Sequence, residues 1–139
     1  MKISANAPCP CGRDAKLKQC CGRYHQGRPA APVALVRARY CAFVLGKVRF
    51  IMDTTHPTAP HVQADRAAWR AELADYCRRV SFEGLTIHDF EVDEPGGQAH
   101  VRFTVQMRHD GTPAGFTERS RFLREGTRWQ YVSGEIEPE

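Results

Sequence analysis

The chain is 139 residues long, 42% hydrophobic and 26% charged, and its formal net charge is +4. This composition is typical of one soluble globular domain with a small appendage. No apolar run approaches the roughly 20 residues that cross a bilayer, and neither a lipidation signal nor an apolar signal segment is found, so we expect a cytoplasmic protein with no membrane association.

Four cysteines lie close together near the start of the chain. Cys9 and Cys11 flank Pro10, and Cys20 and Cys21 follow after eight residues. A tetrahedral zinc ion holds thiolate sulfurs at about 2.3 Å, which places them roughly 3.8 Å apart. Near-adjacent cysteines reach that separation when the chain turns between them, and proline suits the turn. The spacing therefore predicts one structural zinc per chain, bound by all four cysteines.

Other uses of these cysteines stay open from the sequence. Disulfides are disfavoured because the expected compartment is reducing. A redox pair usually has the form C-x-x-C, and an iron–sulfur cluster normally draws on wider or differently spaced cysteines. His25, four residues after Cys21, is a candidate to replace one thiolate in a Cys3His site. We rank it second because four sulfurs already complete a tetrahedron.

The charge is unevenly distributed. Residues 1–39 carry eight Lys or Arg and one acid, Asp14, which gives +7, whereas residues 40–139 carry twelve Lys or Arg and fifteen acids, which gives −3. Zinc bound by four thiolates adds −2 to the first segment. The remaining excess is either a basic surface for an acidic protein or a nucleic acid, or counter-charge for the thiolates. Nucleic acid is ranked last, because Tyr24 is the single aromatic residue before Tyr40 and no stacking platform is present.

A linker separates the cysteines from the rest of the chain. Residues 27–32 contain two prolines within four positions, which deny the backbone helical continuity. We therefore divide the chain into a zinc module with its linker, residues 1–30, and a larger domain, residues 31–139.

The larger domain begins with helical patterns. Apolar side chains at helical spacing predict a first helix from residue 33 to about Gly46 and a short second helix over residues 47–53. Asp65 is a suitable N-cap for a third helix that reaches about residue 79.

The pattern then changes to the alternation of strands. Turn residues separate four segments, which cover residues 82–93, 98–109, 115–125 and 128–136. Short turns between successive strands imply an antiparallel meander. Helices followed by such a sheet predict an α+β domain with the helices on one face of a curved sheet.

Two resemblances support this reading. Cys9-Pro-Cys11-Gly followed by Cys20-Cys21-Gly resembles the SEC-C motif, named for the zinc-binding carboxyl-terminal tail of the SecA preprotein translocase. The wider chain resembles the YchJ family of uncharacterised bacterial proteins, through residues 37–44, 55–57, 118–122 and 129–131.

These resemblances imply a fold and a partner class. The implied fold is a zinc knuckle joined to a nuclear-transport-factor-2-like domain, a cone of about three helices on a curved four-stranded antiparallel sheet. In SecA the motif engages the acidic chaperone SecB and contacts ribosomes. The resemblance thus implies recognition of an acidic partner, with a SecB-like chaperone or the ribosome as candidates by analogy.

Cone-shaped folds of this type commonly enclose a pocket between helix and sheet. The candidate pocket residues are Arg39, Tyr40, His56, Trp69, Arg119, Arg121 and Trp129. Arg119 and Arg121 project from one face of a strand and could clamp a carboxylate or phosphate, or else lie on an exposed face with cross-strand ion pairs. His56 is either a proton carrier or a cap of helix-end carbonyls.

An isomerase-like site needs a buried acid beside a tyrosine. The acids considered are Asp53, Asp89 and Glu118, each of which is expected to be solvent-exposed instead. Cys41 and Cys77 lie within predicted helices, at no metal spacing, and are expected to be buried thiols.

The sequence therefore favours a non-enzymatic cytoplasmic interaction or adaptor protein with structural zinc. Its basic module would recognise a partner protein, while the larger domain supplies a scaffold, a homodimer contact or a ligand pocket. The alternative is a small-molecule-binding protein or enzyme that uses the pocket of the α+β domain, with zinc purely structural.

Overall fold

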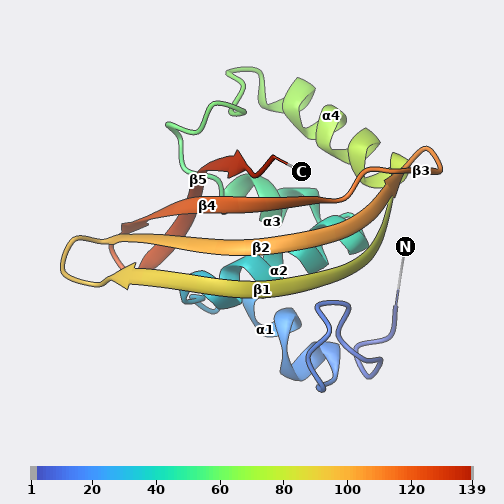
Figure 1. Cartoon of the computed structure of the whole chain (residues 1–139), viewed down its shortest axis with the longest axis horizontal. Helices are drawn as coiled ribbons and strands as arrows, with labels where there is room; N and C mark the ends of the chain where they lie inside the picture. The colour runs from blue at the N-terminus through green and yellow to red at the C-terminus, as the bar shows by residue number, and fades with distance from the viewer. Residues whose placement is uncertain (1–2, 139) are drawn as a thin grey trace.

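The structure is a computed structural model and describes residues 3–138 (Figure 1). Its N-terminal part is irregular apart from two short helices, the 3₁₀-helix η1 (Leu17–Gln19) and α1 (Cys21–His25). Between residues 3 and 30 the buried side chains are those of four cysteines and Leu17. This segment therefore has almost no apolar core of its own.

Two of the three predicted helices follow directly. α2 (Pro32–Leu45) begins with a proline, whose missing N–H is not needed in the first turn. It ends at Gly46, which adopts φ 71°, the left-handed conformation favoured by glycine at helix ends. α3 (Val48–Asp53) follows at once. After the change of direction at Gly46, Phe50 of α3 packs against the same buried cluster as Leu35 and Val36 of α2.

α4 (Arg66–Arg79) is the third predicted helix. The carboxylate of Asp65 accepts a hydrogen bond from the backbone N–H of Ala68 at 3.1 Å, which confirms the predicted N-cap. Trp69 is its buried side chain. In the described part of the chain, no helix is long and apolar enough to span a membrane.

The strands form one antiparallel sheet in the order β1-β2-β4-β5. Their bounds agree closely with the sequence pattern: β1 (Val80–Asp93), β2 (Gln98–His109), β4 (Phe116–Glu125) and β5 (Arg128–Ile136). The structure adds β3 (Thr112–Pro113), a two-residue strand paired with β2 that the sequence did not indicate. The main sheet is thus four-stranded as predicted.

The sheet is curved, and its irregularities explain the curvature. Register shifts interrupt β1 between Phe82 and Gly84 and again between Ile87 and Asp89, and a third lies in β5, where Val132 is the extra residue opposite Arg121 and Phe122 of β4. Such bulges bend a strand and increase its twist. Figure 1 shows α2 and α3 behind the sheet, with α1 and α4 at opposite ends of the molecule.

The core lies between α2 and the inner face of the sheet. Leu35 and Val36 of α2 pack with Val101 and Phe122 of the strands, and Tyr40 packs with a second group further along the sheet. Alternate residues of β2 are buried, as its sequence alternation predicts. The α+β fold with helices on one face of a curved sheet is confirmed.

Candidate functional site

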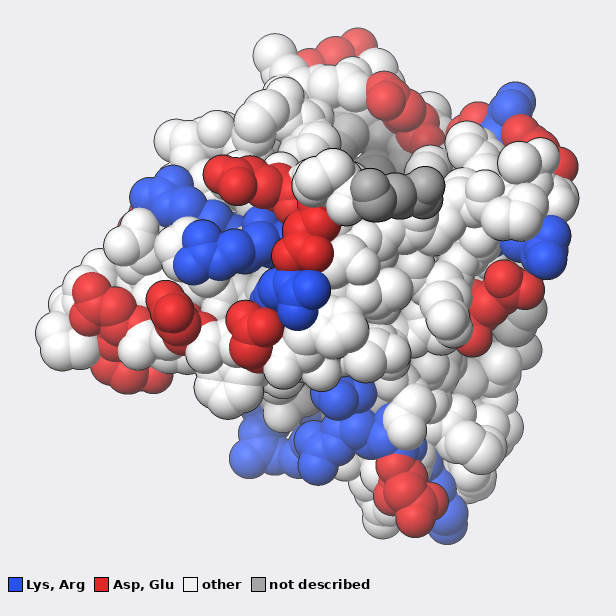
Figure 2. Space-filling view, viewed as in Figure 1, with Lys and Arg blue, Asp and Glu red and all other residues white. Residues whose placement is uncertain are grey.

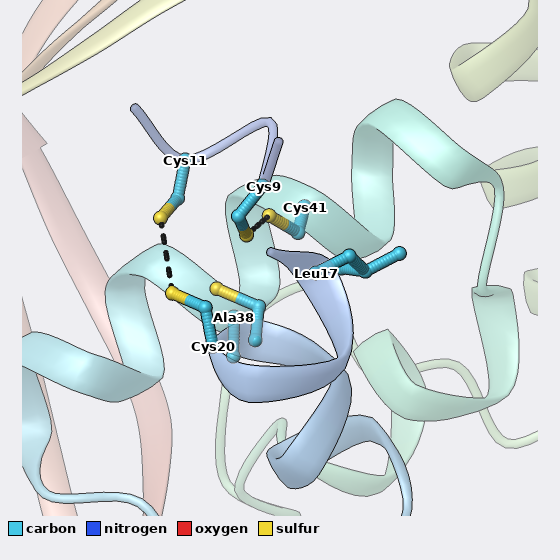
Figure 3. Close-up of a cluster of buried hydrophobic side chains, with 7 residues drawn as sticks. Cys9, Cys11, Leu17, Cys20, Ala38 and Cys41 are labelled. Carbon is cyan, nitrogen blue, oxygen red and sulfur yellow. Dashed lines mark hydrogen bonds between the residues drawn. The ribbon is translucent and has the colours of Figure 1, made fainter. Parts of the chain in front are cut away.

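The four N-terminal cysteines converge. The sulfurs of Cys9, Cys11, Cys20 and Cys21 all lie within 4.8 Å of one another, and all four side chains are buried. Figure 3 shows Cys11 and Cys20 facing each other, with their sulfurs 3.7 Å apart. This separation is close to the roughly 3.8 Å expected around a tetrahedral metal ion. The donor set therefore fits a metal site with four thiolate ligands.

Local backbone geometry positions these side chains. The N–H of Cys9 donates to the carbonyl of Ala15 at 2.9 Å, which closes the loop that carries Cys11. Gly22 follows the second cysteine pair, and a Cβ at this position would lie 2.7 Å from the carbonyl oxygen of Leu17. The glycine after the cysteine pair is thus required for α1 to approach η1.

The electrostatics of the cluster favour a bound cation once all four cysteines are thiolates. Burial, and then the neighbouring Cys11, raise the pKa of the Cys20 thiol to about 11. Four thiols at these separations ionise together only when a cation offsets their charge, and a divalent metal does so. Arg37 donates to the carbonyl of Cys11 and Arg23 to that of Cys20, both at 3.1 Å, so each arginine holds a ligand-bearing segment.

A fifth cysteine borders the cluster. The Cys41 sulfur lies 3.4 Å from that of Cys9, and its side chain is fully buried (Figure 3). The prediction of a buried thiol is confirmed for Cys41, whereas Cys77 is only half-buried. The place of Cys41 beside the metal site was not predicted because it lies on α2, 32 residues from Cys9. Cys41 and Ala38 of α2 share one buried cluster with the four cysteines. The N-terminal segment is therefore packed directly onto α2.

His25 is not one of the residues whose ligand atoms converge. Its Nε2 lies 2.8 Å from the carbonyl oxygen of Ala38, and its ring packs edge-on against Phe50 with centroids 4.7 Å apart. Burial lowers the pKa of His25 below its usual value. The converging group therefore consists of the four cysteines without His25, whose ring contacts α2 and α3.

A cavity of about 580 Å³ lies between the sheet, α2 and α4. Three of the predicted pocket residues line it, namely Arg39, Tyr40 and Trp69. Burial raises the pKa of Tyr40 to about 12, so its hydroxyl stays protonated at neutral pH. The remaining walls are mainly aromatic and aliphatic.

Arg39 is the cation that α2 contributes to this cavity. Its Nη1 donates to the hydroxyl of Thr54 at 2.8 Å, and to the Thr55 hydroxyl and the Ile51 carbonyl at 3.1 Å each. The guanidinium lies over the ring of Tyr131, 4.7 Å from its centroid. Burial lowers the pKa of Arg39 to about 10, which leaves it charged at neutral pH. Arg39 is thus held rigidly at the cavity wall.

Glu118 is the acid that the fold brings to the same wall. Its carboxylate accepts hydrogen bonds from the hydroxyls of Ser120 and Tyr131, the latter at 3.4 Å. Burial, and then Glu118, raise the pKa of Tyr131 above its usual range, so Tyr131 acts as a donor. The expectation of solvent exposure holds for Asp53 and Asp89, which lie in surface ion pairs, but not for Glu118.

Arg119 and Arg121 project from the opposite face of the sheet. Arg119 pairs with Glu91 at 3.8 Å, and Nε of Arg121 donates to Gln98 at 3.1 Å. Burial and then these two arginines lower the pKa of His100, which lies opposite Arg121 on the neighbouring strand. The prediction that they line the pocket is wrong, because the inner side of β4 presents Glu118 and its alternate neighbours instead.

His56 and Trp129 also lie outside the cavity. His56 ties the loop after α3 to the sheet, since its Nε2 lies 2.9 Å from Glu125 and its backbone N–H donates to the carbonyl of Tyr131. Trp129 is buried, and the guanidinium of Arg124 lies over its ring. Neither residue lines this cavity, but Trp129 lines a separate groove beside the linker.

Comparison with known protein families matches both parts of the chain. The SEC-C motif matches residues 6–23, and the family described as "YchJ, middle NTF2-like domain" matches residues 31–134. These two matches correspond to the cysteine cluster and to the helices and sheet described above.

Individual relatives match this chain over most of its length. The chain is 38% identical over 131 residues to UPF0225 protein SCO1677 of Streptomyces coelicolor, covering 93% of this chain and 95% of that protein. It is 32% identical over 128 residues to UPF0225 protein Ent638_2310 of Enterobacter sp. strain 638, covering 91% and 81%. The solution structure of RPA3114, a SEC-C motif containing protein from Rhodopseudomonas palustris, superposes with a TM-score of 0.77 at 26% identity, covering 95% of this chain and all of the other. The chain therefore belongs to the YchJ-like family and joins a SEC-C motif to a YchJ middle NTF2-like domain.

Proposed function

We propose that this protein is a non-enzymatic, cytoplasmic zinc protein whose basic N-terminal module (residues 1–30) recognises an acidic partner protein. Zinc is structural and present once per chain. An acidic chaperone of the SecB type is a candidate partner, by analogy with the SEC-C motif.

Zinc is the metal that this donor set favours. Four thiolates in a compact, buried arrangement are typical ligands of structural zinc. Because four protein ligands complete a tetrahedron, no position is left for water or substrate. The metal would therefore organise the module rather than catalyse a reaction.

The distribution of ion pairs is the observation that carries the proposal. Within the described residues, every ion pair between side chains falls between residues 49 and 137. Five exposed cations nearer the N-terminus lack such a partner: Arg13, Lys16, Lys18, Arg28 and Lys47. Figure 2 shows Lys and Arg gathered at the lower edge of this face, where Figure 1 places α1.

A basic groove adjoins these cations. It has a volume of about 760 Å³ and lies between the linker, α3, α4 and the start of β5. Basic side chains outnumber acidic ones in its lining. The acid is Asp53, and the bases are Arg28, Lys47, Arg49, Arg70 and Arg128. A groove lined by one sign of charge attracts ligands of the opposite sign. An acidic segment that contacts the module would therefore continue into this groove.

Affinity capture from a cell extract tests the proposal. We expect the zinc-loaded protein to retain acidic proteins that are lost on Cys20→Ser/Cys21→Ser substitution and on Lys16→Glu/Lys18→Glu substitution, which reverses charge without removing a ligand. Arg102→Glu, a charge reversal on the sheet, is the matched control. The proposal fails if both module variants capture the same proteins as the wild type.

The cavity supports a second candidate function, the binding of a small molecule by the NTF2-like domain. Small-molecule sites are typically apolar clefts with a few fixed polar groups. The cavity, with Arg39 and Glu118 on one wall, has this form. This function would operate independently of the N-terminal module.

A further inference from the structure

The cavity has the size and lining of a site for an apolar molecule. Its volume of about 580 Å³ lies within the roughly 300–1,000 Å³ of small-molecule sites. The apolar lining is contributed by α2, α4 and the sheet, and includes Phe43, Trp69, Leu73, Phe82, Phe103 and Phe116. Burial of a hydrocarbon against these side chains would stabilise a complex by the hydrophobic effect.

One cation in this lining lacks an ionic partner. Among the described residues, no carboxylate lies within 4.0 Å of the Arg39 guanidinium, and its hydrogen bonds are confined to Nη1. The neutral groups that hold Nη1 fix the guanidinium without neutralising it. Nε and Nη2 therefore remain able to donate to a ligand, and a guanidinium donates in the planar fork that a carboxylate accepts.

The other charged groups of the cavity are already engaged or lie towards α4. Asp75 and Arg79 pair with each other at 2.8 Å. Glu118 accepts hydrogen bonds from Ser120 and Tyr131 and makes no ion pair with Arg39. Its negative charge opposes an anionic ligand nearby, which predicts that its removal would strengthen the binding of such a ligand.

We propose that the cavity binds an apolar monocarboxylate, with the carboxylate on Arg39 and the hydrocarbon against the aromatic wall. This inference rests on the second candidate function, the small-molecule site, and is independent of the N-terminal module. A charge-assisted hydrogen bond contributes about 1.5–3 kcal/mol, so the carboxylate raises affinity about 10- to 100-fold over a neutral ligand of the same length.

NMR titration of the zinc-loaded full chain tests the assignment, with sodium octanoate and 1-octanol as probes. We expect octanoate to bind at least tenfold more tightly than octanol, and Arg39→Met to abolish the difference. Arg121→Met, on the other face of the sheet, is the control and leaves it unchanged. Arg39 also holds Thr54 and Thr55, so its substitution could disturb the cavity itself. Glu118→Gln therefore provides a second test: octanoate should bind several-fold more tightly, and the affinity for octanol should not change.

The outcomes distinguish failure of the carboxylate assignment from failure of the small-molecule site itself. Equal affinity for octanoate and octanol, or an unchanged octanoate affinity in both Arg39→Met and Glu118→Gln, would overturn the carboxylate assignment while leaving a small-molecule site. Failure of both probes to perturb cavity residues would overturn the second candidate function as well. Neither result bears on recognition by the N-terminal module.

Discussion

Removal of the metal should unfold the N-terminal module and leave the NTF2-like domain, here called the sheet domain, folded. Apart from its cysteines, the module buries Leu17 alone among residues 3–30, and burying one leucine contributes about 1.5–3 kcal/mol. Structural zinc in small modules contributes about 10–16 kcal/mol at neutral pH. Metal binding therefore contributes several-fold more free energy to the folding of the module than apolar burial does. The sheet domain has its own core, in which Phe122 and Val101 are fully buried.

The perturbation is Cys20→Ser, compared with Cys77→Ser. Cys77 lies on α4, outside the cysteine cluster, so its substitution controls for the loss of any thiol. Hydrogen exchange read by mass spectrometry should show lost protection at the amides of Cys9 and Leu17, which donate to backbone carbonyls of the module. Strand amides should stay protected. Retained protection of the module in Cys20→Ser would refute the reasoning, as would loss of protection throughout the sheet.

Three further predictions concern the surroundings of the metal. Cys41→Ala should retain stoichiometric metal but lose it about tenfold more readily to a chelator, because a side chain that contacts the ligand Cys9 is removed; complete metal loss would instead make Cys41 a ligand. Gly22→Ala should weaken metal retention in the same chelator assay, because the added methyl would clash with the carbonyl of Leu17; unchanged retention would contradict the close approach. Since burial lowers the pKa of His25 in the folded state, its contribution to stability should be lost as pH falls below the unfolded value of about 6.5. Urea unfolding between pH 7 and 5.5 should thus show a flatter pH dependence in His25→Gln, and identical slopes would contradict this.

The sequence predicted most of the fold because its local signals are strong. Asp65 has a cap geometry that depends on neighbouring residues only, and Gly46 ends its helix through its own conformation. Alternation along β2 similarly identified the buried face of that strand. The N-terminal cysteine spacing could be interpreted for the same reason, since the four ligands lie within thirteen residues of one another.

The errors arose where contacts are distant in sequence. Cys41 reaches the metal site only through the packing of α2 against the module, and His56 meets Glu125 across 69 residues. The strand pattern placed Arg119 and Arg121 on the same face of the sheet but did not show whether that face is buried. Phe122 is apolar and points to the opposite face, which was the signal that the arginines point outward.

X-ray absorption at the zinc edge tests the central claim most directly, because it reads the ligands of the metal without depending on a partner. The account predicts one zinc per chain surrounded by four sulfur atoms at about 2.3 Å, the distance typical of zinc thiolates. It also predicts that Cys11→Ser will not retain this shell, because Cys11 is one of the four converging ligands. A shell with a nitrogen or oxygen ligand in the wild-type protein would contradict the closed four-cysteine site.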